Sequence, residues 1–277
     1  MLVSPAGPET DCPRHVTLID GGLSPRKTAR LLCELGIEPY EVDDLVLTHL
    51  DTDHCHSGWP AALRTNTWSL TTRIHRRHRG RAQRSGMLHS RTELFEEEFG
   101  LGPRITVSPT LMSHDELGVA SFRMQIRRET VAEPALLGFA TDLGRATDDL
   151  IDHLLGVDTL AIESNYCPRM QAESDRPYFL KKRITGGAGH LSNQEALTAI
   201  EQIAPRDHVV LLHLSRECND PQLVGNMHTG AEYAFTISEQ HRPTRWIWVR
   251  PGHGEAPTPT VRRAASEPSL YHTPKRS

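Results

Sequence analysis

Residues 48–58 read Thr-His-Leu-Asp-Thr-Asp-His-Cys-His-Ser-Gly and follow a short apolar run. Its positions 49–54 bring together four side chains of metal-binding type, namely His49, Asp51, Asp53 and His54. In extended backbone, residues two apart point to the same side, so His49 and Asp51 can reach one ion. The adjacent Asp53 and His54 diverge and can serve a neighbouring ion. Because imidazole and carboxylate suit zinc, manganese or iron, the stretch predicts a metal site; the alternative is a charged, solvated loop.

Three later polar residues also follow apolar segments. His114 comes shortly after one such segment, Asp142 follows the run 138–140, and His213 follows the run 209–212. A single His or Asp at a strand end is more typical of a cap or of a hydrogen-bonded polar residue in the core. Together with residues 48–58, however, they strengthen the prediction of a metal site.

The order of apolar runs and caps indicates a mixed α/β protein. Ser24 followed by Pro25 predicts the start of a helix, Thr147 predicts another, and Ser192 with Glu195 has the spacing of a capping box. Polar motifs follow the strands, where a layered α/β scaffold carries its chemistry. The predicted strands are 15–19, 44–47, 137–140, 159–162, 209–212 and 246–249.

Composition bounds the protein class. The 277 residues carry a net charge of −4, which argues against a protein that coats nucleic acid with its whole surface. No apolar run approaches the ~20 residues of a membrane span, and the N-terminal residues do not resemble a signal peptide. The five scattered cysteines favour a reducing cytoplasm over a disulfide framework.

The sequence predicts one folded domain between two polar ends. Residues 1–14 are Pro-rich and lack periodicity, so we expect a loose lead-in. Residues 251–277 contain too few apolar side chains to fold, which predicts a disordered tail. Residues 15–250 remain as the domain.

The spacing His49-x-Asp51-x-Asp53-His54, followed by His114, Asp142 and His213, resembles the five-motif ligand set of the metallo-β-lactamase fold. Two further segments are more specific, Glu-Ser-Asn at 163–165 and Gly-His-Leu-Ser-Asn at 189–193. They resemble the YycJ-like branch, which is related to the phosphoribosyl cyclic phosphodiesterase and to the tRNA 3′-processing endonuclease. The resemblance covers roughly residues 16–250.

This resemblance implies an αββα sandwich with two divalent ions at one edge of its sheets. The ions would be zinc or manganese, with iron as a further option. One ion would take His49, Asp51 and His114. The other would take Asp53, His54 and His213, with Asp142 bridging both. Such a pair, about 3.5–4 Å apart, can hold a hydroxide that attacks a phosphodiester.

The resemblance also assigns residues to catalysis and substrate binding. His190 matches a position that faces the substrate, as a general acid or a phosphate clamp; the alternative is a capping contact on the helix that starts at Ser192. Glu163 is expected to orient His190, and Asp53 is assigned a catalytic role beside its role as ligand. Three residues are expected to bind substrate, namely Asn165, Ser192 and Asn193.

The chain departs from the family pattern at three places. Asp51 stands where the family usually has His. A carboxylate makes the first metal site less suited to zinc and better suited to harder ions, and loss of that site would leave one ion. The Asp20-Gly21-Gly22 turn is not preceded by the usual Ser-Gly-Ser-x-Gly-Asn segment. Either the first strand is missing and a sheet edge is exposed, or the true start lies upstream. Tyr166-Cys167 replaces a common His-Asp and is expected to alter the substrate mouth.

A basic stretch covers residues 73–81 and continues with Arg84 and Arg91. Because Arg binds phosphate in a planar, bidentate manner, one interpretation is contact with a phosphate backbone. The other is a solvated surface whose charge is balanced by the acidic residues 93–98. The stretch has few aromatic residues for stacking bases.

The main functional hypothesis is a metal-dependent enzyme that hydrolyses a phosphodiester. A narrower form of this hypothesis places that phosphodiester at the end of a nucleic acid. One alternative is a lactone or thioester hydrolase on the same fold. Another is a degenerate member that binds metal or nucleic acid without turnover. We expect no membrane partner, and the sequence leaves the oligomeric state open.

Overall fold

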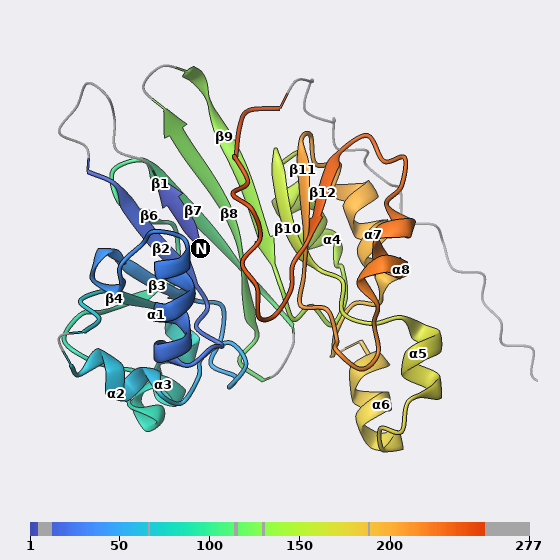
Figure 1. Ribbon diagram of the computed structural model, residues 1–277, viewed down its shortest axis with the longest axis horizontal. Coiled ribbons are helices and arrows are strands. Elements are labelled where there is room, and N and C mark those ends of the chain that lie inside the picture. Colours follow the sequence, from blue (N-terminus) through green and yellow to red (C-terminus); the bar gives the residue numbers. More distant parts are fainter. Residues whose placement is uncertain (5–12, 66, 114–115, 129–130, 188, 253–277) are drawn as a thin grey trace, which may run out of the picture.

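Two β-sheets lie against each other in the computed structural model (Figure 1). The structure describes residues 1–4, 13–65, 67–113, 116–128, 131–187 and 189–252. The first sheet has the strand order β1-β2-β3-β4-β5, in which β2 to β5 are parallel and β1 is antiparallel to β2. Its strands are β1 (Leu2–Ser4), β2 (His15–Ile19), β3 (Asp44–Leu47), β4 (Thr71–His75) and β5 (Thr92–Phe95).

The second sheet has the order β12-β11-β10-β9-β8-β7-β6. Its first half, from β12 to β9, is parallel, and its second half is antiparallel. Its strands are β6 (Phe99–Leu101), β7 (Ile105–Met112), β8 (Val119–Arg128), β9 (Val131–Ala140), β10 (Thr159–Glu163), β11 (His208–Leu212) and β12 (Ala234–Ile237).

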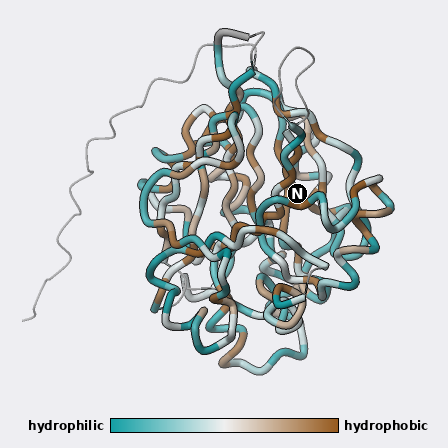
Figure 2. The backbone as a smooth tube through the Cα atoms, turned by 90° about the vertical axis from the view of Figure 1, so that its left-hand side faces the viewer, coloured by the Kyte–Doolittle hydropathy of each residue, from teal (hydrophilic) through white to brown (hydrophobic). Residues whose placement is uncertain are grey.

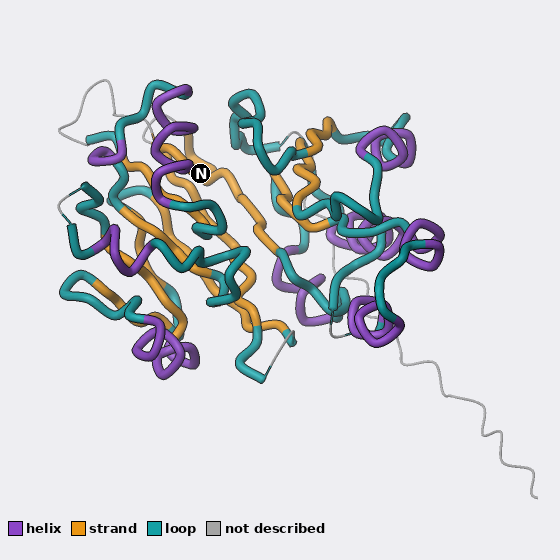
Figure 3. Tube along the Cα trace, turned by 60° about the horizontal axis from the view of Figure 1, so that its bottom comes forward, coloured by secondary structure: helices purple, strands orange, loops and turns teal. Residues whose placement is uncertain are grey.

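Helices cover the outer faces of both sheets, as Figures 1 and 3 show. Two 3-10 turns, η1 (Pro39–Glu41) and η2 (Arg76–His78), lie among the segments that follow the first sheet's strands. The α-helices are α1 (Pro25–Glu34), α2 (Trp59–Leu63), α3 (Arg79–Ser85), α4 (Asp148–Leu154), α5 (Pro168–Glu173), α6 (Tyr178–Thr185), α7 (Asn193–Ile203) and α8 (Pro221–Met227).

Three buried apolar clusters hold these layers together. Between the sheets, Val46 and Phe95 of the first sheet pack with residues of the second such as Phe122. On the outer side of the first sheet, Trp59 belongs to a cluster with α1, α2 and α3. On the outer side of the second, Ile200 belongs to a cluster with α4, α7 and α8. Apolar residues concentrate inside the molecule (Figure 2), and the αββα sandwich expected from the sequence is confirmed.

Three helices begin at the capping residues that the sequence predicted. Ser24 caps α1 by accepting the Lys27 backbone N–H, and Thr147 caps α4 in the same way. Ser192 and Glu195 form the reciprocal capping box of α7. These caps satisfy backbone donors that would otherwise lack partners in the first helical turn.

Two expectations about strands were wrong. Leu2–Ser4, placed in the loose lead-in, forms β1 and pairs with β2 from Leu2 opposite Thr17 to Ser4 opposite His15. A short first strand therefore covers that sheet edge. Residues 246–249 form no strand; instead Val249 packs on the inter-sheet cluster, and its carbonyl accepts a hydrogen bond from Arg128.

The ends of the predicted domain are only partly described. The chain can be followed to Gly252, whose backbone N–H donates to Asp158 at 2.6 Å, and residues 253–277 of the predicted tail lie outside the described residues. Among the helices of the described part, none is long and apolar enough to cross a lipid bilayer.

Candidate metal centre

The segments that carry the predicted ligands meet at one edge of the sandwich. The 48–58 segment follows β3, Asp142 follows β9, and His213 comes directly after β11. Because β9, β10 and β11 are parallel neighbours, their carboxyl ends lie at the same edge of the sheet. This topology explains why polar residues distant in sequence converge there.

Three residues at this edge have left-handed backbone conformations. Asp20, Asp142 and His213 have φ angles of 61°, 52° and 57°. Asp and His tolerate this region better than most residues without being free of strain there. Such conformations concentrate at functional sites, where the surrounding structure maintains them.

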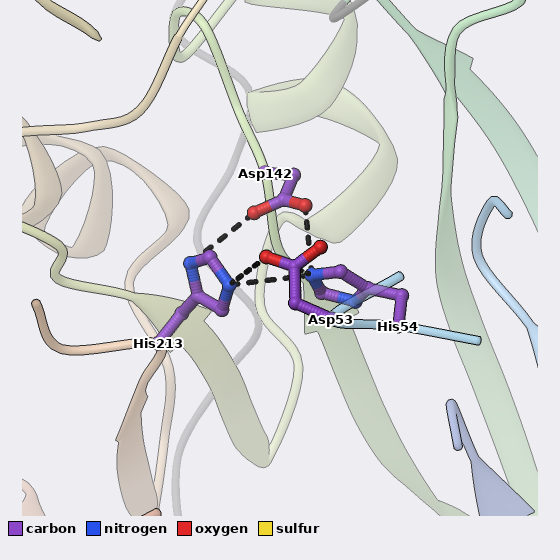
Figure 4. Close-up of side chains that lie close together, drawn as sticks. All are labelled: Asp53, His54, Asp142 and His213. Carbon is purple, nitrogen blue, oxygen red and sulfur yellow. Dashed lines mark hydrogen bonds and ion pairs between the residues drawn. The ribbon is translucent and has the colours of Figure 1, made fainter. Parts of the chain in front are cut away.

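Asp53, His54, Asp142 and His213 bring one potential ligand atom each within 4.8 Å of one another. The Nε2 atoms of His54 and His213 are 3.2 Å apart, and an Asp142 oxygen lies 2.8 Å from the His54 Nε2. An Asp53 oxygen lies 3.9 Å from that nitrogen and 3.8 Å from the His213 Nε2. Figure 4 shows the Asp142 carboxylate reaching both rings and the Asp53 carboxylate beside the gap between them.

This group fits a divalent metal ion in both chemistry and spacing. Two imidazoles and two carboxylates are a donor set that zinc, manganese and iron accept. With bonds of about 2.0–2.1 Å, two ligand atoms on one tetrahedral ion lie about 3.3 Å apart, close to the 3.2 Å that separates the His54 and His213 nitrogens. The His/Asp cluster and the fold therefore indicate divalent metal binding.

His190 lies beside this group and is held by two carboxylates. Its Nδ1 is 3.2 Å from Glu163 and 3.3 Å from Asp142. Glu163 is fully buried and also accepts the backbone N–H groups of Leu143 and Leu191. Glu163 is therefore placed to orient His190, as the resemblance implies, and the ring lies beside the metal group. The catalytic role of His190 stays a prediction.

Hydrogen bonds from other residues hold the candidate ligands in place. Asp20 lies 2.7 Å from the Nδ1 of His54 and accepts the Thr48 backbone N–H at 2.8 Å. The Asn165 amide donates to the His213 carbonyl at 2.7 Å and lies 3.1 Å from its Nδ1. Such contacts fix ring orientation and leave the opposite nitrogen for the metal.

The opposite charges of this group stabilise one another. Burial lowers the pKa of His213, but hydrogen bonds with Asp53 and Glu163 outweigh it and raise the pKa to about 10. For His190, Asp142 and Glu163 outweigh burial and raise the pKa to about 9. The hydrogen bond with His213 lowers the pKa of Asp53 to about 2. Metal binding must therefore displace protons from the imidazoles.

The other predicted ligands form a different environment. The His49 Nε2 lies 3.1 Å from Asp142 and 3.8 Å from Asp51. Asp51 forms an ion pair with Arg81 of α3 at 2.5 Å. His114, predicted to complete this site, lies outside the described residues. The structure thus brings His49 and Asp51 to the centre but gives Asp51 an arginine partner.

Two of the predicted substrate-binding residues have structural hydrogen bonds. Ser192 is the N-cap of α7. The buried Asn193 side chain donates to Asn219 at 2.8 Å and accepts from Ser164 at 2.8 Å, and Asn219 also donates to the Asn165 carbonyl. Contact of Asn165, Ser192 and Asn193 with substrate stays a prediction.

The basic stretch is partly neutralised within the first sheet. Arg73 pairs with Asp44 at 2.8 Å and with Glu93, and Arg76 lies 3.6 Å from Glu96. These pairs agree with the interpretation in which the acidic residues downstream balance the charge. Arg81 differs, because it reaches the candidate centre.

The turn at Asp20-Gly21-Gly22 requires its glycines. A Cβ on Gly22 would lie 1.7 Å from the Asp53 carbonyl oxygen, and the Gly21 backbone N–H donates to the His54 carbonyl at 2.6 Å. The turn therefore packs its backbone directly on the ligand loop. Any larger residue at Gly22 would displace Asp53.

Sequence reasoning did not predict the contacts that Asp20, Arg81 and Asn219 make at this site. Asp20 had a usable signal, because it directly follows an apolar strand, β2, as the other candidate residues follow theirs. Arg81 was named only as part of a basic run, and Asn219 was not singled out. Neither their spacing nor their neighbours in sequence indicate the contacts they make.

Residues 15–214 match the protein family described as Beta-lactamase superfamily domain. The chain is 26% identical over 220 residues to Exodeoxyribonuclease WalJ of Streptococcus pneumoniae serotype 2 (strain D39), covering 74% of this chain and 76% of that protein. It is 22% identical over 225 residues to Exodeoxyribonuclease YycJ of Bacillus anthracis, with the same coverage of 74% and 76%. These similarities confirm the resemblance to the YycJ-like branch.

A solved structure supports the fold assignment independently of these relatives. The metallo-beta-lactamase fold protein YhfI from Bacillus subtilis superposes with a TM-score of 0.58 at 17% identity. The superposition covers 80% of this chain and 84% of that one. At this identity, the similarity shows the shared fold.

Proposed function

Because the chain belongs to the Beta-lactamase superfamily domain family, we propose that it is a metal-dependent phosphodiesterase that acts as a nuclease. One observation carries this proposal. The Glu163–His190 pair lies directly beside a group of Asp and His side chains that fits a divalent ion. The names of the two exodeoxyribonuclease relatives support a nucleic acid as substrate.

The residues of the centre divide into ligands and a proton donor. Asp53, His54, Asp142 and His213 would hold a divalent ion, which would supply Lewis-acid stabilisation of phosphoryl charge and activation of water. Burial lowers the pKa of His190, but Asp142 and Glu163 outweigh it and raise the pKa to about 9, which favours a proton on the ring. We assign His190 the transfer of that proton to the leaving oxygen, with Glu163 keeping the ring in place.

The number and identity of the ions remain predictions. The described residues support one ligand group around Asp53 and His54, and a second group of Asp142, Glu163, His190 and His213 shares two of its members. Two ions, zinc or manganese with iron as the further option, are the expectation from the family resemblance. The cytoplasmic location also remains a prediction.

Hydrolysis of bis-p-nitrophenyl phosphate and of labelled DNA strands tests the function. The full chain is stripped with a chelator and reloaded separately with zinc, manganese or iron. We expect nitrophenol release and strand shortening only with metal, and loss of both in the His190→Gln variant with metal uptake unchanged. Arg84→Gln, a change of an exposed residue of α3, serves as the control.

Three outcomes would redirect the assignment. Full turnover by His190→Gln with metal bound would show that His190 is not the acid. Hydrolysis of lactones or thioesters but not of phosphodiesters would favour the alternative hydrolase. Metal uptake and strand binding without any hydrolysis would indicate the non-catalytic member.

A further inference from the structure

Helix α6 exposes two aromatic side chains at the edge of the molecule that carries the centre. Tyr178 is 80% and Phe179 is 73% exposed. Figure 1 shows α5 and α6 projecting beyond the second sheet, after β10. Large aromatic side chains are usually at least half buried in a folded protein, so this pair needs an explanation.

The opposite face of α6 anchors the helix. Leu180 and Ile184, one turn apart, pack with Tyr166 and Cys218 in a small apolar cluster. The Lys181 ammonium donates to the Ala172 carbonyl at 2.7 Å. The helix is therefore fixed by its inner face, and the exposure of the aromatic pair does not result from a lack of packing.

Two cations accompany the aromatic pair on the outer face. Residues four apart are neighbours on a helix surface, so Lys182 lies next to Tyr178 and Arg183 next to Phe179. Both cations are exposed. We call Tyr178, Phe179, Lys182 and Arg183 the α6 face. It consists of two rows, each with an aromatic ring followed by a positive charge.

Helix α6 contacts the two segments that carry His190 and His213. The Ile184 carbonyl, in the last turn of α6, accepts the His190 backbone N–H at 3.2 Å. A Cβ on Gly189 would lie 2.3 Å from that same carbonyl. Arg176, just before α6, donates to Ser215 at 3.2 Å and to Glu217 at 2.9 Å, in the loop after His213.

The length of the helix sets the distance from the aromatic pair to the last turn of α6, which contacts the His190 backbone. With a rise of 1.5 Å per residue, α6 places the pair about 10 Å from its anchored end. This corresponds to about three nucleotide spacings along a stacked strand. A strand that runs along α6 from its last turn would therefore reach both rings within about three nucleotides.

We propose that the α6 face binds single-stranded nucleic acid that extends from the centre, with bases stacked on Tyr178 and Phe179 and phosphates paired with Lys182 and Arg183. This inference rests on the proposed function and specifies its substrate as a single strand. Stacked aromatic rings with neighbouring cations are the chemistry by which proteins bind single strands without reading their sequence.

Other occupants fit this face less well. In a symmetric pair of copies, the face would meet itself and bring Lys182 and Arg183 toward their own counterparts, which is unfavourable. An anionic lipid surface would satisfy the same charges and rings. The connection to His190, however, is explained by a substrate strand and not by a lipid surface.

Binding is measured on the full chain in chelator, so that the strand is not cut. The probe is a short fluorescent oligothymidylate, read by anisotropy. Stacking contributes about 1–3 kcal/mol per base, so we expect the Tyr178→Ser/Phe179→Ser double variant to bind about tenfold more weakly or worse. Tyr40→Ser is the matched control, because Tyr40 is 71% exposed but lies between Glu38 and Glu41.

Two additional probes separate the rings from the charges. Wild-type protein should bind an abasic strand of the same length about as weakly as the double variant binds oligothymidylate. Lys182→Gln/Arg183→Gln should reduce the slope of log affinity against log salt by about 1.4, since each phosphate contact in a single strand contributes about 0.7. An oligouridylate arm distinguishes RNA from DNA as the source of the strand.

The outcomes distinguish this inference from the proposed function. Equal binding of oligothymidylate by wild type and Tyr178→Ser/Phe179→Ser overturns the inference. So does a double variant that loses only its binding to vesicles of anionic lipid, or only its dimer in sedimentation, while it still binds oligothymidylate. Bis-p-nitrophenyl phosphate is too short to reach the α6 face, so the double variant should hydrolyse it at the wild-type rate. Absence of that hydrolysis in wild type overturns the proposed function, while the anisotropy result still decides the inference.

Discussion

Two buried aspartates, Asp142 and Asp44, have opposite kinds of partner. Asp142 lies at the candidate centre within 3.3 Å of nitrogens from four imidazoles, those of His49, His54, His190 and His213. Asp44 lies in the first sheet, 2.8 Å from the Arg73 guanidinium and 2.7 Å from the His15 ring. Both carboxylates are almost completely buried.

The partner decides what each carboxylate can do. A guanidinium keeps its charge at every accessible pH, so the compensation of Asp44 by Arg73 is permanent. Imidazoles release their protons to solvent when they bind a metal ion, so the compensation of Asp142 can be exchanged for that ion. Burial alone therefore does not identify a functional carboxylate; the exchangeability of its partner does.

Asp51 shares one feature with Asp142 and one with Asp44. It belongs to the ligand loop and lies 3.8 Å from the His49 Nε2. Its ion pair with Arg81, however, supplies a cation that no metal can replace without movement of the arginine. The Asp51 side of the centre is thus expected to hold an ion less tightly than the His54 side.

The largest expected effect is the loss of metal from Asp142→Asn. The amide cannot supply the negative charge that four imidazoles and a dication require. Changes in residues behind the ligands cost about 10–100-fold in metal affinity, so we expect replacement of this ligand to cost more than about 100-fold. Elemental analysis after chelation and reloading measures the loss, with hydrolysis expected to fall in parallel. Retention of metal would break the comparison.

Asp44→Asn should have the reverse pattern. Removing one partner of a buried ion pair costs about 3–5 kcal/mol because the other charge loses its compensation. Arg73 keeps its contact with Glu93, which places the expected loss near the lower end, about 3 kcal/mol. Urea unfolding of the metal-free protein measures it. Metal uptake per folded chain should equal that of wild type, and a loss of uptake would contradict the structural role.

Arg81→Met tests the intermediate case. Removing the guanidinium leaves Asp51 free for an ion and removes a positive charge that repels the ion. Because the Asp51 and Arg81 side chains are 28% and 33% exposed, solvent screening limits the gain to about tenfold in affinity for a further ion. Titration calorimetry with manganese measures it.

The control for this change is Arg84→Met, on the same helix but exposed. It should leave the affinity unchanged, and the gain in Arg81→Met should shrink at high salt. Equal affinities in wild type and Arg81→Met would show that the arginine does not compete with metal.

The sequence was informative where a function depends on a short segment. The candidate ligands at 49–54, Asp142 and His213 each follow a strand, and parallel strands bring their ends together, so a local pattern was sufficient to predict that they meet. The caps of α1 and α7 were predictable for the same reason. Glu163 was expected near His190 from the resemblance alone.

Contacts between distant segments were not predictable in this way. Asp51 and Arg81 are 30 residues apart, and nothing in either segment indicates the other. Leu2–Ser4 is too short to show a strand pattern, and it forms one because β2 offers an edge. The apolar run at 246–249 was misleading, because an apolar run does not show whether a neighbouring strand is available to pair with it.

The smallest expected effect concerns the only titratable cation partner described beside Asp44. The hydrogen bond with Asp44 raises the pKa of His15 above its ordinary value of 6.5 despite partial burial. The resulting stability is therefore fully present below pH 6.5 and is lost as the pH rises through the folded-state pKa. In wild type we expect the free energy of unfolding to fall by less than about 1 kcal/mol between pH 6 and 9 for this reason. His15→Gln should remove this decline, as measured by urea unfolding of the metal-free protein. An unchanged slope would mean that Arg73 alone compensates Asp44, and the contrast with the imidazole-surrounded Asp142 would become sharper.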